Sequence, residues 1–381
     1  PCVRLRLAPE GRHALERILE AIPSETLTAD DALGWVYQFW QKDKKDEVNA
    51  SERKIGGGDL GPVTQLFTEN YMVRFLLENS LGAWWAARHP DSPLVKGFDY
   101  LRLGDAGAPA AGAFESGPDR VGKVTVIDPC CGSGHFLVEA FSLLWQMRAE
   151  EEGLSPVEAQ DAVLRDNLFG LELDPRCVQI AMFNVALQAW KAGGGWRQLP
   201  VPEVACSGIP VKAPIEEWKA LANGDERVEN ALVRLHALFR DADTLGSLID
   251  PRRAVATIGS LQSQRSLDEV GWDEVTPVLQ AAAVWEGSDL AAAVFGIHAT
   301  TLARAAQLLT RRYTLVATNV PYLKRARQQE ELRRHCDRNY ADARHDLALA
   351  MLERIAGLAH SSAVVLPHSW LFMSWNRAFR Q

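Results

Sequence analysis

The sequence has no long apolar run and no cysteine pattern that would hold a metal ion or a disulfide framework. No apolar stretch approaches the ~18 residues that cross a membrane, so we expect no transmembrane helix. The six cysteines, at positions 2, 130, 131, 177, 206 and 336, form no CxxC pair and have no histidine at metal-ligand spacing. This usage predicts a cytoplasmic protein without a zinc site, in a reducing compartment.

A large excess of positive charge is also absent. The formal net charge of −8 argues against nucleic-acid binding by the whole surface. The distribution is uneven, because the stretch from Arg311 to Arg344 holds nine Lys or Arg against four Asp or Glu. Local charge steers a ligand more than the total does, so this stretch is either a contact region for an anion or an ordinary solvated face.

The length of 381 residues exceeds that of a usual single domain, and predicts one large α/β domain with an appendage. The chain begins PCVRLRLA, without methionine or a signal-peptide pattern, and ends at WNRAFRQ. We therefore expect it to be a piece of a longer protein, truncated at its C-terminus.

Residues 1–101 read as a helical region. Apolar residues recur at helical spacing, and we expect these faces to lie in a core. They are Leu15, Ile18, Leu19 and Ile22, then Leu33, Val36, Phe39 and Trp40, then the run YMVRFLLENSLGAWW. The polar stretch 42–59 is interpreted as an exposed or mobile connection, and residues 102–122, rich in Gly, Ala and Pro, as a loop.

From residue 123 onward, short apolar strands alternate with helical sequence. The expected strands are KVTVID (123–128), FGLEL (169–173), EVACS (203–207), YTLVAT (313–318) and SAVVLP (362–367). Ser155, Pro156 and Glu158 mark a helix start between the first two. Such alternation predicts an α/β fold with a mostly parallel sheet covered on both faces. Residues of about 214–310 are too many for one crossover and predict a helical insertion.

The first expected strand runs into a glycine turn, DPCCGSGHFL (128–137). Gly132 and Gly134 would let the backbone approach a ligand, and the helix that starts near His135 offers free N–H groups. Leu137 stands where GxGxxG has its third glycine, and GxxxxGK[ST] is absent, so a pyrophosphate is not indicated. Glu172, at the end of the second strand, is either a solvated acid or an acceptor for the ribose hydroxyls of an adenosyl ligand.

In this order, DPCCGSGHFL, FGLELD and TNVPY resemble the S-adenosylmethionine-dependent amino-methyltransferases of DNA, whose usual motifs are DPxCGSGxFL and NPPY. QLFTENYMVRFLLENSL (65–81) resembles the motif that closes over the methionine end of the cofactor, and its place before the first strand is typical of the adenine-N6 branch. The resemblance implies a Rossmann-like class I methyltransferase domain over residues 123–381. It also implies a cofactor site formed by Thr68, Asp128, Cys130, Gly132, Gly134, Phe136, Glu172, Leu173 and Ser207. Glu69 departs from the proline common at its position.

Further segments, LGWVYQFWQKDKKDEV and VVLPHSWLF, resemble the large methyltransferases of phage-defence and restriction systems, especially the BREX type (PglX-like). The related DISARM and type IIG enzymes are close competitors. The resemblance implies double-stranded DNA as partner, through a recognition domain missing from this chain, together with other defence-system proteins. Residues 1–381 alone are then expected to bind cofactor but to methylate DNA poorly.

The segment NVPY suits the chemistry of an amino group whose lone pair is delocalised. The side-chain oxygen of Asn319 and the carbonyl of Val320 could each accept one N–H, which would aim the nitrogen at a methyl donor. Pro321 keeps the residue before it extended, and Tyr322 offers a face on which a flipped base could stack. The predicted function is site-specific DNA adenine-N6 methylation.

Alternatives remain for several positions. The NVPY segment could be a strand-terminating turn, or the clamp could serve a planar amine of protein glutamine or RNA guanine. The chain could also be a non-catalytic cofactor-binding scaffold. Ser207 could be a plain loop serine, and Asp243 could supply an acid near the cofactor or lie on the surface. We expect no nucleophilic role for Cys130 or Cys131, and no catalytic role for His135.

Overall fold

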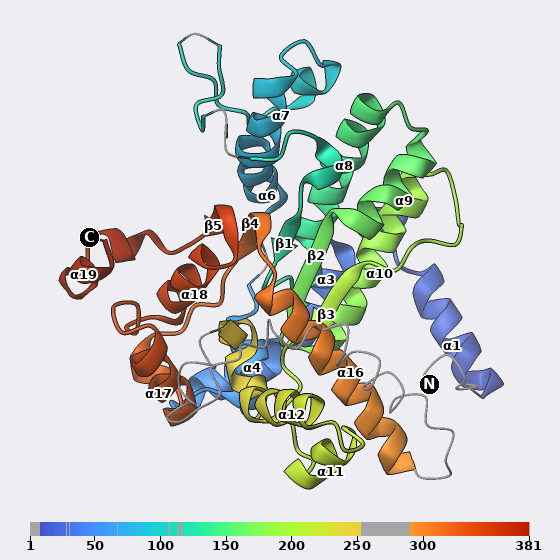
Figure 1. The fold of residues 1–381 in the computed structure, drawn as a ribbon. Helices are drawn as coiled ribbons and strands as arrows, with labels where there is room; N and C mark the ends of the chain where they lie inside the picture. The colour runs from blue at the N-terminus through green and yellow to red at the C-terminus, as the bar shows by residue number, and fades with distance from the viewer. Residues whose placement is uncertain are drawn as a thin grey trace.

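The computed structural model describes residues 8–252 and 290–380, apart from Thr28, Asp30, Phe67, Ala106, Ala113, Glu115 and Ser116. Its centre is a five-stranded sheet with helices on both sides (Figure 1). The strands are β1 (Val126–Asp128), β2 (Leu168–Glu172), β3 (Glu203–Cys206), β4 (Tyr313–Asn319) and β5 (Ala359–Val365). They lie in the order β3-β2-β1-β4-β5, and each neighbouring pair is parallel. The predicted α/β fold with a parallel sheet is confirmed.

Successive side chains of each strand point to opposite faces, and this alternation divides the interior into two apolar cores. Val126, Leu168 and Leu315 belong to one core, and their neighbours Ile127, Phe169 and Val316 belong to the other. The first core is closed by α8 (His135–Glu152), α9 (Pro156–Asp166) and α10 (Pro175–Ala192). The second is closed by α12 (Glu226–Leu238), α16 (Leu290–Thr310) and α18 (Leu347–Ala356).

Local signals start two of these helices where the sequence predicts. Ser155 caps α9, its side chain accepts from the Glu158 N–H, and the Glu158 carboxylate bonds back to the Ser155 N–H. This capping box satisfies two amide groups that the first turn leaves without helical partners. α8 begins directly after Gly134, whose φ of 88° a residue with a side chain adopts only with strain.

The N-terminal region is helical as expected, but only part of it packs as expected. It comprises α1 (Pro9–Glu20), α2 (Ser24–Leu27), α3 (Ala32–Trp40), α4 (Lys42–Ala50), α5 (Leu60–Thr64), α6 (Asn70–Leu77), a π-helical turn (Glu78–Gly82) and α7 (Ala83–Arg88). Val73, Leu77 and Trp85, from α6 and α7, lie in the first core. These two helices therefore fix the segment 65–81 against the sheet domain.

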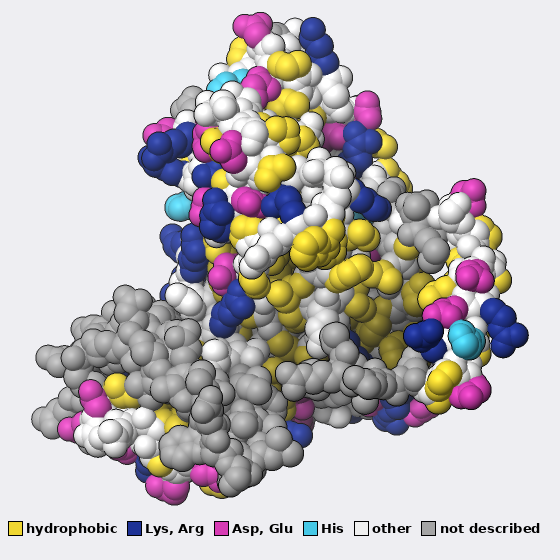
Figure 2. Space-filling model, turned by 90° about the vertical axis from the view of Figure 1, so that its right-hand side faces the viewer, with side chains coloured by type: hydrophobic (Ala, Val, Ile, Leu, Met, Phe, Trp, Pro, Cys, Tyr) yellow, Lys and Arg dark blue, Asp and Glu magenta, His cyan; other side chains and the backbone are white. Residues whose placement is uncertain are grey.

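The predicted core faces of α1 and α3 are wrong. No residue of α1 is buried, and Ile18 is 62% exposed. On α3, Phe39 and Trp40 are 78% and 72% exposed, while the helix buries Gly34 and Tyr37. Figure 2 views the side on which α1 lies and shows hydrophobic side chains gathered there, some of them in a hollow. Helical periodicity detects an apolar face, but it does not say what that face packs against.

The polar stretch 42–59 is not a mere connection. Its first half forms α4, which is supported by pairs such as Lys42 with Asp46 at a spacing of four residues. Val48 of α4 is completely buried. Ile55 is 1% exposed, and its backbone pairs with that of Gln328 in an isolated parallel β-bridge. Two apolar residues therefore anchor this charged segment to the second core.

The expected insertion of about 214–310 contains α11 (Ile215–Ala220), α12, α13 (Ala242–Leu245) and a 3-10 turn (Gly246–Leu248). Residues 253–289 lie outside the described residues. The sequence interpretation also included the helix that ends at Thr310. In the structure the last turns of α16 pack against β2 and β3, so this helix is the crossover that returns the chain to the sheet.

The last strand begins earlier than predicted. β5 starts at Ala359, whereas the sequence predicts its start at 362. Its first four residues alternate between half-buried and exposed, as in an edge strand, so they lack the apolar run that marks the inner strands. Beyond β4 and β5 lie α17 (Glu330–Asn339) and α19 (Arg377–Arg380). Among the described residues, no helix has the length and apolar character of a membrane span.

Candidate active site

A crevice lies at the carboxyl ends of β1, β2 and β4, where the strand order reverses beside β1. It consists of two adjoining cavities, of about 100 Å³ and about 80 Å³. Both are lined by Gln65, Leu66, Cys130, Gly132 and Asn319. The fold thus brings the N-terminal segment, the glycine turn and the NVPY segment to one place.

The two glycines of the turn have different roles. Gly132 has a φ of 52°, lines both cavities, and has no atom within 4 Å of where a Cβ would lie. Gly134 lines neither cavity, and a Cβ on it would lie 2.9 Å from Cα of Ala181 in α10. The sequence assigns both glycines to the cofactor site. In the structure, Gly132 leaves open space beside the cavities, whereas Gly134 allows α8 and α10 to pack closely.

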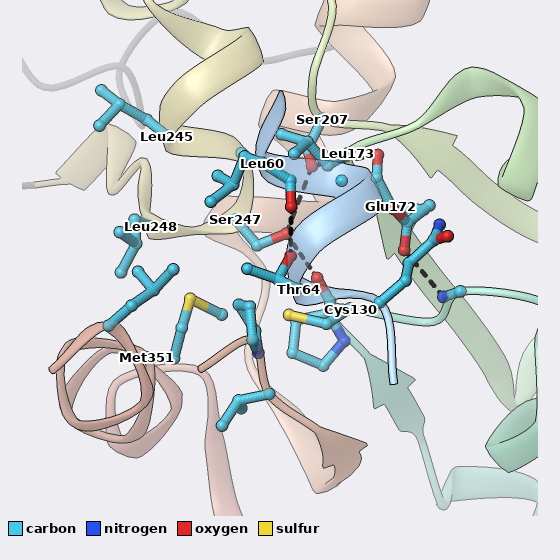
Figure 3. A pocket seen from close by; sticks show the side chains of 18 of the residues that line it. Leu60, Thr64, Cys130, Glu172, Leu173, Ser207, Leu245, Ser247, Leu248 and Met351 are labelled. Carbon is cyan, nitrogen blue, oxygen red and sulfur yellow. Dashed lines mark hydrogen bonds between the residues drawn. The ribbon is translucent and has the colours of Figure 1, made fainter. Parts of the chain in front are cut away.

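Glu172 ends β2 and lines the larger cavity (Figure 3). It is 7% exposed, and its two carboxylate oxygens accept from the backbone N–H groups of Gly132, at 2.8 Å, and Asp174, at 3.0 Å. Burial raises the pKa of this carboxyl group, against the effect of the backbone donors. Each carboxylate oxygen can accept more than one hydrogen bond, so Glu172 can also receive hydroxyl groups of a ligand.

Leu173 and Ser207 line the larger cavity beside Glu172, and the turn after α13 lines it from another side (Figure 3). Ser207 is completely buried, and its Oγ lies 3.4 Å from Oγ of Ser247. Ser247 in turn donates to the carbonyl of Pro129 at 2.6 Å. The sequence did not predict Ser247. Asp243, which the sequence offered as a possible acid here, lines neither cavity and lies near Gly57.

The carboxyl group of Asp128 is also buried, and Asp128 lines the smaller cavity with Thr68 and Phe136. Its Oδ1 accepts from Oγ1 of Thr318 at 2.6 Å and from the N–H of Cys130 at 3.0 Å. Burial raises the pKa of Asp128 to about 7, although both donors act in the opposite direction. A cationic group beside Asp128 would favour its charged form.

The two thiols of the glycine turn are poor nucleophiles. Burial raises the pKa of Cys130 and of Cys131 well above the ordinary value, so both stay protonated. No group of three or more His, Cys, Asp or Glu with the geometry of a metal site occurs among the residues that the structure describes.

Asn319 is held at the end of β4 by two hydroxyl groups. Its Nδ2 donates to Oγ1 of Thr68 at 3.0 Å, and the hydroxyl of Tyr322 donates to its Oδ1 at 2.7 Å. Burial raises the pKa of Tyr322 to about 12, so the hydroxyl keeps its proton. Val320 and Pro321 line the larger cavity, whereas Tyr322 lines neither. The amide of Asn319 therefore has a fixed orientation at the junction of the two cavities.

Helix α3 contributes residues that the sequence reasoning missed. Asp31 accepts from Oγ of Ser133 in the glycine turn at 2.5 Å, and Tyr37 donates to Asp174 just after β2 at 2.5 Å. Asp31, Gly34, Tyr37 and Gln38 all line the smaller cavity. Gly34, Tyr37 and Gln38 follow Asp31, the N-cap residue of α3, by three, six and seven residues. This spacing is the signal that was available, because it marks a largely polar stripe on one face of a helix.

The fold is that of a Rossmann-like methyltransferase. It combines a parallel sheet in this strand order with a glycine turn after β1, a buried acid at the end of β2 and an Asn-Val-Pro-Tyr segment at the end of β4.

Comparisons with known proteins give the nearer relationship. Residues 111–207 match the family described as the DNA-methyltransferase domain of MmeI. The chain is 28% identical to the adenine-specific methyltransferase BrxX of Escherichia coli O9:H4 (strain HS), over 96% of this chain and 31% of that protein. It is 25% identical to the adenine-specific methyltransferase PglX of Lacticaseibacillus casei (strain Zhang), over 92% of this chain and 29% of that protein. These similarities confirm the predicted resemblance to adenine-specific methyltransferases of the PglX type.

The chain spans less than a third of the length of these two relatives. The solved cryoEM structure of the DrdV-DNA complex aligns with 98% of this chain and 27% of that chain, at 15% identity and a TM-score of 0.48.

Proposed function

We propose that this chain is the methyltransferase part of a site-specific DNA adenine-N6 methyltransferase of a phage-defence or restriction-modification system. It would transfer a methyl group from S-adenosylmethionine to an adenine flipped out of the duplex. The observation that carries this proposal is that Asn319 lines both cavities of the crevice, so a clamp for an amino group adjoins a site with the features of a nucleoside pocket. The relatives named adenine-specific methyltransferases support the choice of adenine in DNA.

The donor groups of the crevice fit S-adenosylmethionine. Glu172 can accept from a ribose diol, with Leu173 and Ser207 on its adenine side. Asp128 suits an ammonium group, with Thr68, Cys130, Gly132 and Phe136 beside it, whereas Gly134 acts through packing. When bound, the cofactor would supply a methyl group on a positively charged sulfur.

The adenine amino group is a weak nucleophile because its lone pair is delocalised into the ring. Oδ1 of Asn319 and the backbone carbonyl of Val320 are the two acceptors we assign to its N–H groups. Thr68 and Tyr322 hold the Asn319 amide so that its oxygen does not rotate away. Pro321 restricts Val320 to extended backbone. Tyr322 either orients Asn319 through its hydroxyl group or stacks on the base, and the two roles are compatible.

The decisive experiment is sequencing of methylated bases in DNA from cells that express the complete reading frame containing this chain. Asn319→Ala should abolish N6-methyladenine at the recognised sites while cofactor affinity, measured by calorimetry, stays nearly unchanged. Asn49→Ala, at an exposed position of α4, is the matched control and should methylate normally. Retained methylation in Asn319→Ala would disprove the assigned acceptor. Transfer to RNA or protein, offered separately with no transfer to duplex DNA, would disprove the substrate.

A further inference from the structure

Three segments that carry exposed cationic residues are joined by hydrogen bonds and backbone pairing. Residues 324–327 follow the NVPY segment directly, and the chain around Ile55 lies against them. The Ile55 N–H donates to the carbonyl of Arg327 at 2.6 Å, and Nζ of Lys54 donates to the carbonyl of Ala326. The third segment, which contains Arg344, lies beside them because the backbones of Lys324 and Asp346 pair in an isolated antiparallel β-bridge. We call Lys54, Lys324 and Arg344 the cation triad.

The triad differs from its basic neighbours in lacking acidic partners. Arg53 pairs with Asp59, and Arg325 pairs with Asp337. Lys54, Lys324 and Arg344 are exposed, and none forms an ion pair with a carboxylate of the described residues. Their charge is therefore available to a ligand.

Asp346 interacts with the charge of Lys324 but forms no ion pair with it among the described residues. Its carboxylate accepts from the backbone N–H of Ala348 at 3.0 Å. Asp342, on the same loop, is exposed. Burial lowers the pKa of His345, and the charges of Arg344 and Arg325 lower it further, as expected in a positive potential. Residues 324–327 and 344–346 together carry four Lys or Arg against one Asp, and such an excess of positive charge attracts anions.

Two members of the triad lie close along the chain to residues that line the larger cavity. Lys324 lies three residues after Pro321, which lines the larger cavity, and Arg344 lies three residues before Leu347, which lines it too. The two segments are joined by the Leu347 N–H, which donates to the carbonyl of Leu323 at 3.0 Å. Anions bound by Lys324 and Arg344 would therefore lie near the larger cavity.

We propose that Lys54, Lys324 and Arg344 bind backbone phosphates of the DNA strand that flank the nucleotide entering the crevice. This inference rests on the proposed function. A base can enter only if it leaves the duplex, and phosphate contacts beside it hold the strand in the distorted form. Such contacts carry no sequence information, so the triad would act with any target site.

The test is the salt dependence of DNA binding by the protein from the complete reading frame. One variant carries Lys54→Gln, Lys324→Gln and Arg344→Gln. The control carries Lys96→Gln, Lys191→Gln and Arg165→Gln, three exposed cations elsewhere that also form no ion pair with described carboxylates. Binding of a labelled duplex is followed by fluorescence anisotropy at several salt concentrations.

The logarithm of the association constant K falls linearly with the logarithm of the salt concentration. Each lost phosphate contact should make this slope less steep by ~0.9, so the slope of the triad variant should be less steep by ~2.7. Between about 50 and 200 mM salt, its affinity should then fall about 40-fold less than that of the native protein. The control should keep the native slope. If the triple variant fails to fold, Lys324→Gln alone should lower the slope by ~0.9.

Equal slopes in the native protein and the triad variant would overturn the inference, as would a change of slope with duplex RNA but not with DNA. Methyl transfer by the native protein is measured in parallel. If the native protein methylates DNA but its slope equals that of the triad variant, only the role of the triad is disproved. If the two slopes differ but the native protein methylates no DNA, only the proposed enzyme activity is disproved.

Discussion

Replacing Asp128 with asparagine should remove a pH-dependent cost to folding. The carboxyl group is 1% exposed, and burial raises its pKa to about 7. An aspartate in an unfolded chain titrates near ~3.9. Because the pKa is higher in the folded protein, ionisation between these two values favours the unfolded state, and stability falls as pH rises through this window. Asparagine does not ionise, and its oxygen can accept the same bonds from Thr318 and Cys130.

The magnitude follows from the two pKa values. With ~3.9 unfolded and about 7 folded, ionisation of Asp128 costs about 1.5 kcal/mol at pH 5 and about 4 kcal/mol at pH 8. The free energy of unfolding of Asp128→Asn, relative to the native protein, should therefore rise by about 2.5 kcal/mol between these pH values. The charge of Glu172 contributes to the raised pKa, so part of this gain reflects relief of that repulsion.

Urea unfolding followed by tryptophan fluorescence measures this difference at unit steps of pH. The matched control is Asp91→Asn, at an exposed position, whose stability should run parallel to that of the native protein across the range. Parallel curves for Asp128→Asn and the native protein would refute the reasoning, because they would mean that Asp128 titrates alike in the folded and unfolded states.

Three further changes have definite expected results. Gly134→Ala should lower the free energy of unfolding, measured in urea, by about 2–4 kcal/mol, because φ is 88° and the new Cβ would lie 2.9 Å from Cα of Ala181. Tyr322→Phe should slow methyl transfer about fivefold at unchanged cofactor affinity, since Asn319 loses a hydrogen bond of ~1 kcal/mol. Arg354→Leu should cost about 3–5 kcal/mol in the same unfolding assay, because the 2% exposed guanidinium bonds two buried carbonyls and lies near an acid.

Matched controls separate these causes from general damage. Gly153→Ala has a similar φ of 68° but open space around the new Cβ, so it should cost only about 1–2 kcal/mol. Arg334→Leu removes an exposed arginine and should change stability by less than about 1 kcal/mol. A larger loss of stability in Gly153→Ala than in Gly134→Ala would contradict the packing argument. A larger loss of stability in Arg334→Leu than in Arg354→Leu would contradict the argument from the buried guanidinium. Tyr322→Phe that transfers methyl groups at the native rate would exclude a positioning role for the hydroxyl group.

The inner strands and the glycine turn could be predicted because their signals are local. β1, β2 and β4 are short and largely apolar, and each ends in a residue type that suits a crevice: Asp128, Glu172 and Asn319. The start of β5 was predicted three residues too late, because an edge strand needs no continuous apolar run. The path of the insertion could not be predicted either. Nothing in the sequence around Ser247 indicates that this segment packs against the glycine turn, where Ser247 donates to the carbonyl of Pro129.

Chain-local chemistry determined the parallel α/β sheet, the turn that leaves room beside Gly132, and the order of the segments along the chain. Tertiary structure decided which faces those segments present. It turned the polar stripe of α3, with Asp31 and Tyr37, toward the crevice and left Phe39 and Trp40 exposed. It also joined Thr68 to Asn319 across 251 positions. Periodicity fixes the faces of a helix, but only contacts between distant segments select the face that is buried.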